Sequence, residues 1–157
     1  MQVPDTVGYL LGSWRVERRI EDRLSSLTGL FVGSATVTGA PGPRDDPNPS
    51  TEAPLVYYRE VGTLRWDAHD IPSGRILAVT PSEFGGAVLR FPDGRHFVDI
   101  DLRYGGSDAR HVCGDDVYVI DLTVHSQCLY EESWRVRGPH KDYTAHAIHE
   151  RAIPKLR

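Results

Sequence analysis

The chain has 157 residues, of which 39% are hydrophobic, and its formal net charge is −4. This length and composition predict one domain with a substantial core, and the scattered basic residues argue against nucleic acid or an anionic membrane as a partner. The sequence contains no apolar run of membrane-spanning length and no signal-peptide pattern, so we expect a cytoplasmic protein with two reduced cysteines, Cys113 and Cys128.

The first residues predict a short helix. Asp5 and Thr6 are suited to capping a helical turn over residues 7–11, and Gly12 ends that turn. We expect this helix to form a lid over one end of a barrel.

Two strands and a long loop are predicted next. Residues 14–21 alternate apolar and polar side chains, with Arg18 on the apolar face, so this arginine is expected inside the barrel or at its rim. Residues 29–38 carry small side chains on one face, which allows bending or the close approach of a bulky group. Residues 39–54 are mostly Gly, Pro, Ser, Thr, Asp and Asn, which predicts a flexible loop.

The middle of the chain predicts short strands separated by turns. A strand at residues 55–64 carries Tyr58 and Glu60 among aliphatic residues. Further strands are expected at 75–80, 87–91 and 96–104, with turns at 67–74 and 81–86, a hairpin at 92–95 and a loop at 105–108.

Residues 111–124 place titratable and strand-forming side chains in one predicted hairpin. Residues 114–116, Gly-Asp-Asp, have turn chemistry, and residues 117–124 alternate with the period of a strand. If the apolar side of this strand faces inward, four polar or reactive side chains line one wall of the interior: His111, Cys113, Asp116 and Tyr118.

The last strands are predicted at residues 130–137 and 143–153, with a turn at 138–142. Short strands at regular spacing favour an all-β fold, a single antiparallel up-and-down β-barrel of about 8–10 strands, with an open sandwich as the alternative. Residues 1–157 then form one domain.

The residues Gly12-Ser13-Trp14 resemble the GxW signature of lipocalins, in which a late arginine, here Arg151, packs over the tryptophan. The longer pattern resembles an uncharacterised bacterial family of lipocalin-like domains in the calycin superfamily. That pattern comprises Trp14, Val16, Arg18, Ile20, Phe31, Gly33, Ala35, Tyr58, Glu60, Gly62, Leu64, Asp93-Gly94-Arg95, His111, Cys113, Asp116, Tyr118, Trp134, Val136, Gly138-Pro139 and Lys141-Asp142-Tyr143.

The resemblance implies a calycin-type barrel, and we expect it to hold a cavity of several hundred cubic ångströms. Val98 stands where the family pattern has histidine, and residues 78–84 replace an Arg-x-Tyr-x-Trp strand, which favours a different ligand from those of relatives. Some calycins bind haem through a barrel histidine, so haem is a minor alternative. Ligand contacts are expected from Arg18, Phe31, Tyr118, Trp134 and Tyr143.

Four side chains are candidate catalytic groups. Glu60 is either a base whose pKa burial raises or the partner of Arg18 in an ion pair, and the sequence does not decide between these. Tyr58 is a candidate hydrogen-bond donor, and His111 is either an acid/base group or the cap of a turn. Asp116 either joins this chemistry or orders its own turn.

No metal-ligand spacing, nucleotide-binding loop or hydrolase triad supports a metal or a cofactor, so we expect neither. We predict a cofactor-independent cyclase or isomerase of a bacterial secondary-metabolite pathway, acting on a small, largely apolar, carbonyl-bearing molecule. The alternative is a non-catalytic carrier or sensor of a small hydrophobic metabolite. A homodimer is possible in either case.

Overall fold

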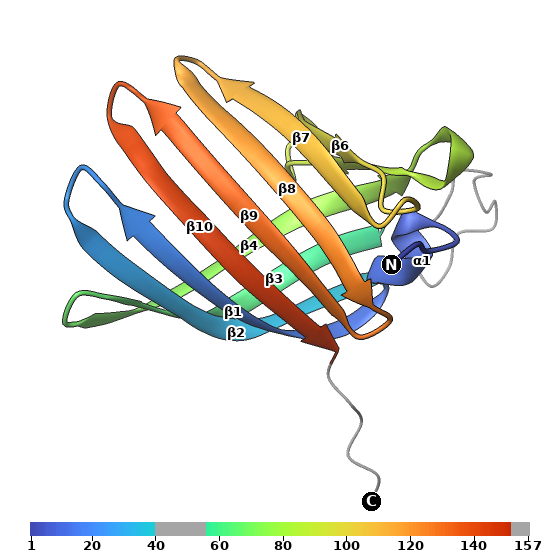
Figure 1. Ribbon diagram of the computed structural model, residues 1–157, viewed down its shortest axis with the longest axis horizontal. Helices are drawn as coiled ribbons and strands as arrows, with labels where there is room; N and C mark the ends of the chain where they lie inside the picture. Colours follow the sequence, from blue (N-terminus) through green and yellow to red (C-terminus); the bar gives the residue numbers. More distant parts are fainter. Residues whose placement is uncertain (40–55, 152–157) are drawn as a thin grey trace, which may run out of the picture.

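A computed structural model describes residues 1–39 and 56–151. Ten antiparallel strands form one sheet in the order β6-β5-β4-β3-β2-β1-β10-β9-β8-β7, which curls into a nearly closed barrel (Figure 1). The predicted all-β, up-and-down barrel is confirmed. The loop predicted at 39–54 lies outside the described residues, apart from Gly39 at the end of β2.

The elements are α1 (Thr6–Leu10), β1 (Gly12–Asp22), β2 (Leu27–Gly39), β3 (Val56–Trp66), β4 (His69–Pro81), η1 (Glu83–Gly85), β5 (Ala87–Arg90), β6 (His96–Ile100), β7 (Gly106–Cys113), β8 (Asp116–Ser126), β9 (Leu129–Gly138) and β10 (Lys141–Arg151). The turns of the β1–β2, β3–β4, β7–β8 and β9–β10 hairpins point to one end of the barrel, the hairpin end, and α1 lies at the other (Figure 1). In the part of the chain that the structure describes, no helix is long and apolar enough to cross a membrane.

The α1 end is closed by packing around a buried tryptophan. Asp5 caps α1, accepting a hydrogen bond from the backbone N–H of Gly8 at 2.6 Å. Trp14 is fully buried, and its indole N–H donates to the Leu10 carbonyl oxygen at 2.8 Å. The guanidinium of Arg151 lies 4.3 Å from the Trp14 ring centroid. The tryptophan–arginine packing that the lipocalin-like signature implies is therefore present.

Paired glycines let an aromatic ring lie close to the inner wall. Gly33 on β2 is directly opposite Gly62 on β3, and a Cβ added to Gly33 would lie 2.7 Å from the Phe31 ring and collide with the Val61 carbonyl oxygen. The ring then lies 5.4 Å from the guanidinium carbon of Arg18. This is the close approach that the small residues of the strand predict.

The turn predicted at 67–74 is confined to residues 67–68, because β4 already begins at His69 and pairs with β3 from there. On the side of β4 that faces away from β3, β5 pairs only with Ala78–Pro81. Pro72 therefore has no strand partner on that side, and its missing backbone N–H costs no hydrogen bond there. The turn residues of this stretch indicate an edge strand rather than a loop.

The barrel wall is open between β6 and β7, which are not neighbours in the hydrogen-bonded sheet. The predicted strand at 96–104 ends at Ile100, because the backbone N–H of Leu102 donates instead to the hydroxyl of Thr6 near α1. β5 and β6 have only 4 and 5 residues, against 13 in β4. Among the described residues, the hairpin-end half of β4 consequently has no strand paired on its outer side, which leaves a side opening in the barrel.

Candidate functional site

Four charged side chains meet across the middle of the barrel, and we call them the ionic cluster: Arg18 on β1, Glu60 on β3, Arg75 on β4 and Glu132 on β9. Arg18 donates two hydrogen bonds to Glu60, at 2.7 and 2.9 Å. Arg75 Nη2 donates to both oxygens of Glu132, at 2.9 and 3.2 Å. Each arginine also lies within 3.7 Å of the other glutamate. The two positive and two negative charges cancel.

Aromatic side chains complete the surroundings of the ionic cluster. The Tyr58 hydroxyl donates to Glu60 at 2.5 Å, and the Trp134 indole N–H donates to Glu132. The guanidinium carbon of Arg75 lies 5.2 Å from the Tyr58 ring centroid and 5.0 Å from that of Trp134. Arg75 is thus held by two rings as well as by its ion pair.

Both carboxylates of the ionic cluster are held in the charged form. Burial alone would raise the pKa of Glu60, but the hydrogen bond from Arg18 and the charge of Arg75 outweigh it and lower the pKa. In the same way the charges of Arg75 and Arg18 overcome burial and lower the pKa of Glu132 to about 2. The structure therefore pairs Glu60 with Arg18 and does not give it the raised pKa expected of a base.

A buried histidine borders the ionic cluster without adding charge to it. His149 stacks on Tyr130 with ring centroids 4.2 Å apart, and its Nε2 lies 3.4 Å from the Tyr58 hydroxyl oxygen. Its Nδ1 has no hydrogen-bond partner among the described residues. Burial lowers the pKa of His149 to about 4, so its imidazole is neutral at pH 7.

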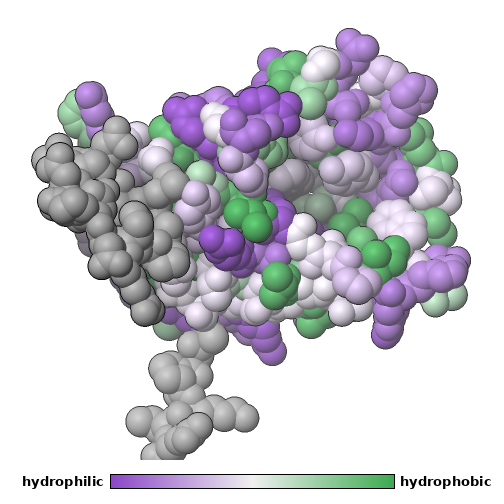
Figure 2. All heavy atoms as spheres, turned by 180° about the vertical axis from the view of Figure 1, so that it is seen from behind, coloured by the Kyte–Doolittle hydropathy of each residue, from purple (hydrophilic) through white to green (hydrophobic). Residues whose placement is uncertain are grey.

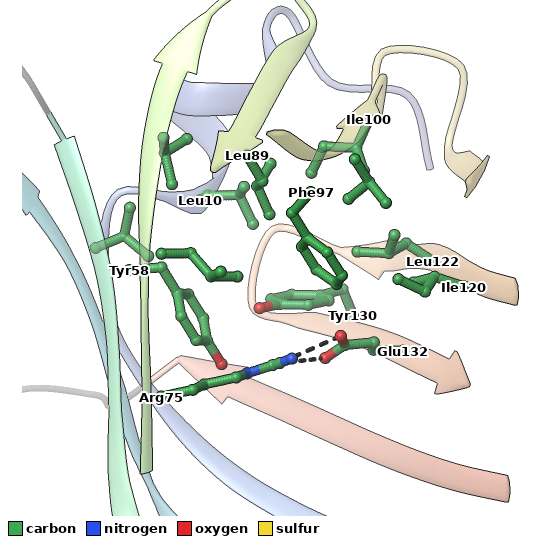
Figure 3. A pocket seen from close by; sticks show the side chains of 14 residues that line it. Leu10, Tyr58, Arg75, Leu89, Phe97, Ile100, Ile120, Leu122, Tyr130 and Glu132 are labelled. Atoms are coloured by element: carbon green, nitrogen blue, oxygen red, sulfur yellow. Dashed lines mark hydrogen bonds and ion pairs between the residues drawn. The ribbon is translucent and has the colours of Figure 1, made fainter. Parts of the chain in front are cut away.

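A narrow inner cavity lies between the ionic cluster and α1, with Arg75, Glu132 and Tyr58 at its polar side and aliphatic and aromatic side chains around the rest (Figure 3). The cavity measures about 40 Å³, which is room for water or one small group. It is smaller than the several hundred cubic ångströms that we expected. The aliphatic lining includes Leu10, Leu77, Leu89, Ile100, Ile120 and Leu122.

A larger hollow of about 200 Å³, the side pocket, shares Arg75, Leu77 and Phe97 with the inner cavity. Its lining comes from both sides of the side opening, the free part of β4 on one side and β7 to β9 on the other. The view from behind shows the surface of the barrel hollowed between its upper and lower parts (Figure 2). The remaining lining residues are Ile76, Phe91, His111, Cys113, Tyr118 and Trp134.

His111 lies in the side pocket and bridges the open seam. Its Nδ1 lies 2.9 Å from the carbonyl oxygen of Phe97 on β6. Because a carbonyl oxygen only accepts, Nδ1 carries the proton of this hydrogen bond, and in the neutral ring Nε2 is the acceptor. The imidazole also packs edge-on against Phe91 and Phe97. His111 is therefore oriented by the fold rather than free in solvent.

The remaining predicted site residues lie toward the hairpin end. Asp116 pairs with Lys141 at 2.7 Å, and Lys141 donates to the Tyr118 hydroxyl at 2.9 Å. Tyr143 is half-buried and lines two surface hollows at this end, of about 470 and 360 Å³. The predicted site thus divides. Arg18 and Glu60 belong to the ionic cluster, and Phe31, Tyr58 and Trp134 contact it. His111 and Tyr118 line the side pocket together with Trp134, whereas Asp116 is paired with Lys141.

Sequence reasoning missed three side chains of this region: Arg75, Glu132 and His149. Each one shares a strand face with apolar neighbours, as Arg18 does on β1. In β9, for example, Glu132 alternates with Tyr130 and Trp134. The same signal that selected Arg18 could have found all three.

A family model described as "Family of unknown function (DUF6314)" matches residues 10–151. The S-type phycobiliprotein lyase CPES from Guillardia theta superposes with a TM-score of 0.67 at 14% identity, covering 95% of this chain and 92% of the lyase. A protein of unknown function of the DUF3598 family from Nostoc punctiforme gives 0.57 at 12% identity, covering 94% of this chain and 49% of that one. At such identities the likeness shows the fold alone. No curated protein matches the sequence.

Proposed function

The chain belongs to the DUF6314 family of unknown function, and on that premise we propose that its barrel binds a small, largely apolar molecule in the side pocket. The observation that carries this proposal is the pocket itself, where aromatic and aliphatic walls surround the single guanidinium of Arg75. Small-molecule sites typically combine such apolar walls with a few polar groups that orient the ligand.

The ionic cluster supports binding rather than proton transfer. Glu60 and Glu132 are paired with arginines and have lowered pKa values, so neither carboxylate accepts a proton readily near neutral pH. The fold likeness to a phycobiliprotein lyase adds support, because antiparallel barrels of about this strand number can enclose one small ligand.

Filling the side pocket should test this proposal. Cys113 lines the pocket and is exposed, whereas Cys128 is an exposed cysteine outside the pocket, in the turn between β8 and β9. We expect 2-nonanone to shift the NMR signal of the Trp134 indole N–H in the wild type. Cys113→Trp should weaken binding by about tenfold or more, equivalent to about 1.4 kcal/mol. Cys128→Trp should bind 2-nonanone as tightly as the wild type does. If both variants bind it equally weakly, the ketone does not bind in the side pocket.

A cofactor-independent isomerase or cyclase, including one of secondary metabolism, is the second candidate, and His111 favours it. The imidazole and the Arg75 guanidinium line the same pocket, and the hydrogen bond to Phe97 leaves Nε2 as the acceptor in the neutral ring. A base and a cation facing one carbonyl compound are the groups needed to remove a proton next to the carbonyl and stabilise the enolate. In this second candidate His111 takes the role of base that Glu60 was expected to have.

Hydrogen exchange into a bound ketone would detect this chemistry. In deuterated buffer the wild type should exchange the hydrogens next to the carbonyl of 2-nonanone faster than buffer alone, as followed by NMR. His111→Asn retains a donor for the Phe97 carbonyl oxygen but removes the base, so it should bind the ketone without exchanging it. Exchange at the buffer rate with wild-type protein would leave the carrier function and exclude the isomerase for this ketone.

A further inference from the structure

We infer that the side pocket selects ligands whose polar group is a neutral hydrogen-bond acceptor, a ketone, aldehyde or ester carbonyl, over ligands that end in a carboxylate. This inference rests on the proposed function and specifies the ligand class of the same site. Its basis is the combination of a donor available at Arg75 and an interior whose charges already cancel.

Arg75 has hydrogen-bonding capacity left. Its hydrogen bonds to described residues all run from Nη2 to Glu132, and its buried Nε lies 3.6 Å from Glu60. Among the described residues Nη1 has no hydrogen-bond partner, which leaves it as the donor for a ligand. The side chain is 24% accessible and borders both the side pocket and the inner cavity. Figure 3 shows it extending across the base of the inner cavity toward Glu132. A ligand oxygen reaching this point meets a planar donor held between two aromatic rings.

The charges around that donor are already balanced. Arg75 faces Glu132 and lies 3.6 Å from Glu60, and Arg18 faces Glu60 and lies 3.7 Å from Glu132. Nearer the hairpin end, Lys141 and Asp116 form a pair of their own. A ligand in the side pocket therefore finds hydrogen-bond donors but no uncompensated positive charge.

This balance separates two kinds of ligand. A carboxylate would bring a third negative charge beside Glu60 and Glu132 and would lose its hydration without gaining an unpaired cation, which is costly at a buried site. A carbonyl oxygen accepts the same N–H group and brings no charge with it. A pocket with an unpaired arginine would have the opposite preference, because charge-assisted bonds to carboxylates are the stronger ones.

The test compares two molecules with the same alkyl chain, 2-nonanone and octanoate, in titrations at about pH 8, where the acid is ionised. The wild type should bind 2-nonanone about tenfold or more tighter than octanoate. Glu132→Gln leaves one positive charge uncompensated, so octanoate binding should strengthen about tenfold or more relative to 2-nonanone binding. Glu131→Gln, on the outer face of β9 where Glu131 pairs with His125 and His146, is the matched control and should change neither affinity.

Octanoate binding the wild type as tightly as 2-nonanone, or more tightly, overturns the inference while leaving the proposed function intact. That comparison needs no variant, so it decides the question even if Glu132→Gln does not fold. A folded Glu132→Gln protein with an unchanged preference also overturns the inference. If neither molecule binds, the proposed function fails and this inference fails with it.

Discussion

His149 lies fully buried against Tyr130 beside the ionic cluster, and its titration couples folding to pH. Its pKa falls from 6.5 to about 4 because burial disfavours the charged ring, so the folded chain binds this proton less readily than the unfolded chain. The stability that this residue contributes is complete above pH 6.5 and is lost as the pH falls toward 4. The depressed pKa of Glu132 acts in the same direction at lower pH, down to about 2.

We therefore predict that His149→Phe loses less stability than the wild type between pH 6.5 and 5. Phenylalanine keeps the stack on Tyr130 but has no proton to bind in the unfolded state. Urea unfolding at several pH values measures the difference, and His140→Phe, in the exposed β9–β10 turn, serves as the control. Parallel pH profiles for the wild type and His149→Phe would show that His149 is not the coupled group.

Trp14 supports the closed end of the barrel, and removing its side chain should strongly destabilise the fold. The ring is fully buried, donates to Leu10 and lies under Arg151. Truncation of a buried aromatic costs about 3–5 kcal/mol, so Trp14→Ala should lower the free energy of unfolding by about that amount. Near-UV circular dichroism and chemical unfolding measure the loss, and an unaltered spectrum and midpoint would contradict the packing described for this end.

The sequence alone predicts some of the polar residues that face the inside of the barrel. Arg18 and Glu60 were found because each is charged on an otherwise apolar strand face, and Arg75 and Glu132 carry the same signal. Periodicity gives the face of a strand but not the neighbour across the barrel, so it could not show that each glutamate has its own arginine. That pairing decides whether a carboxylate is a base or a structural anion.

On β2, the element with paired glycines, a single added methyl group should disturb the wall. Gly33→Ala places a Cβ against the Val61 carbonyl oxygen and the Phe31 ring, so we expect a loss of about 1–3 kcal/mol from overpacking. Gly39→Ala, at the end of the same strand, meets no described atom within 4 Å and is the matched control. Equal melting temperatures for the two variants would show that the wall yields at Gly33.

The boundaries of β4 show where sequence reasoning fails at the scale of elements. Residues 69–74 contain Asp, Pro, Ser and Gly, and these residue types indicate a turn in the absence of other information. They form a strand because β3 offers a partner ladder, and Pro72 is tolerated because the other edge is free. The presence of a free edge depends on the lengths of β5 and β6, which local composition does not reveal.

For the whole molecule, the regular spacing of strands and turns was enough to predict an up-and-down barrel. The sequence could not show where this barrel stays open, because the seam between β6 and β7 depends on how the first and last strands of the sheet meet. Arg18, Tyr58, Glu60, His111, Asp116 and Tyr118 are polar candidates on separate strands, and strand periodicity alone does not show whether they share one cavity. In the structure Arg18 and Glu60 pair in the ionic cluster beside Tyr58, His111 and Tyr118 line the side pocket, and Asp116 pairs with Lys141.

A crystal structure of the protein with 2-nonanone is the most direct measurement of the central claim, that the side pocket holds a small apolar ligand by its polar group. We expect the alkyl chain to lie against Phe97 and Trp134, with the carbonyl oxygen within hydrogen-bonding distance of Arg75. A ketone that lies only on the outer surface, or in the barrel with its carbonyl directed away from Arg75, would contradict the proposed binding mode.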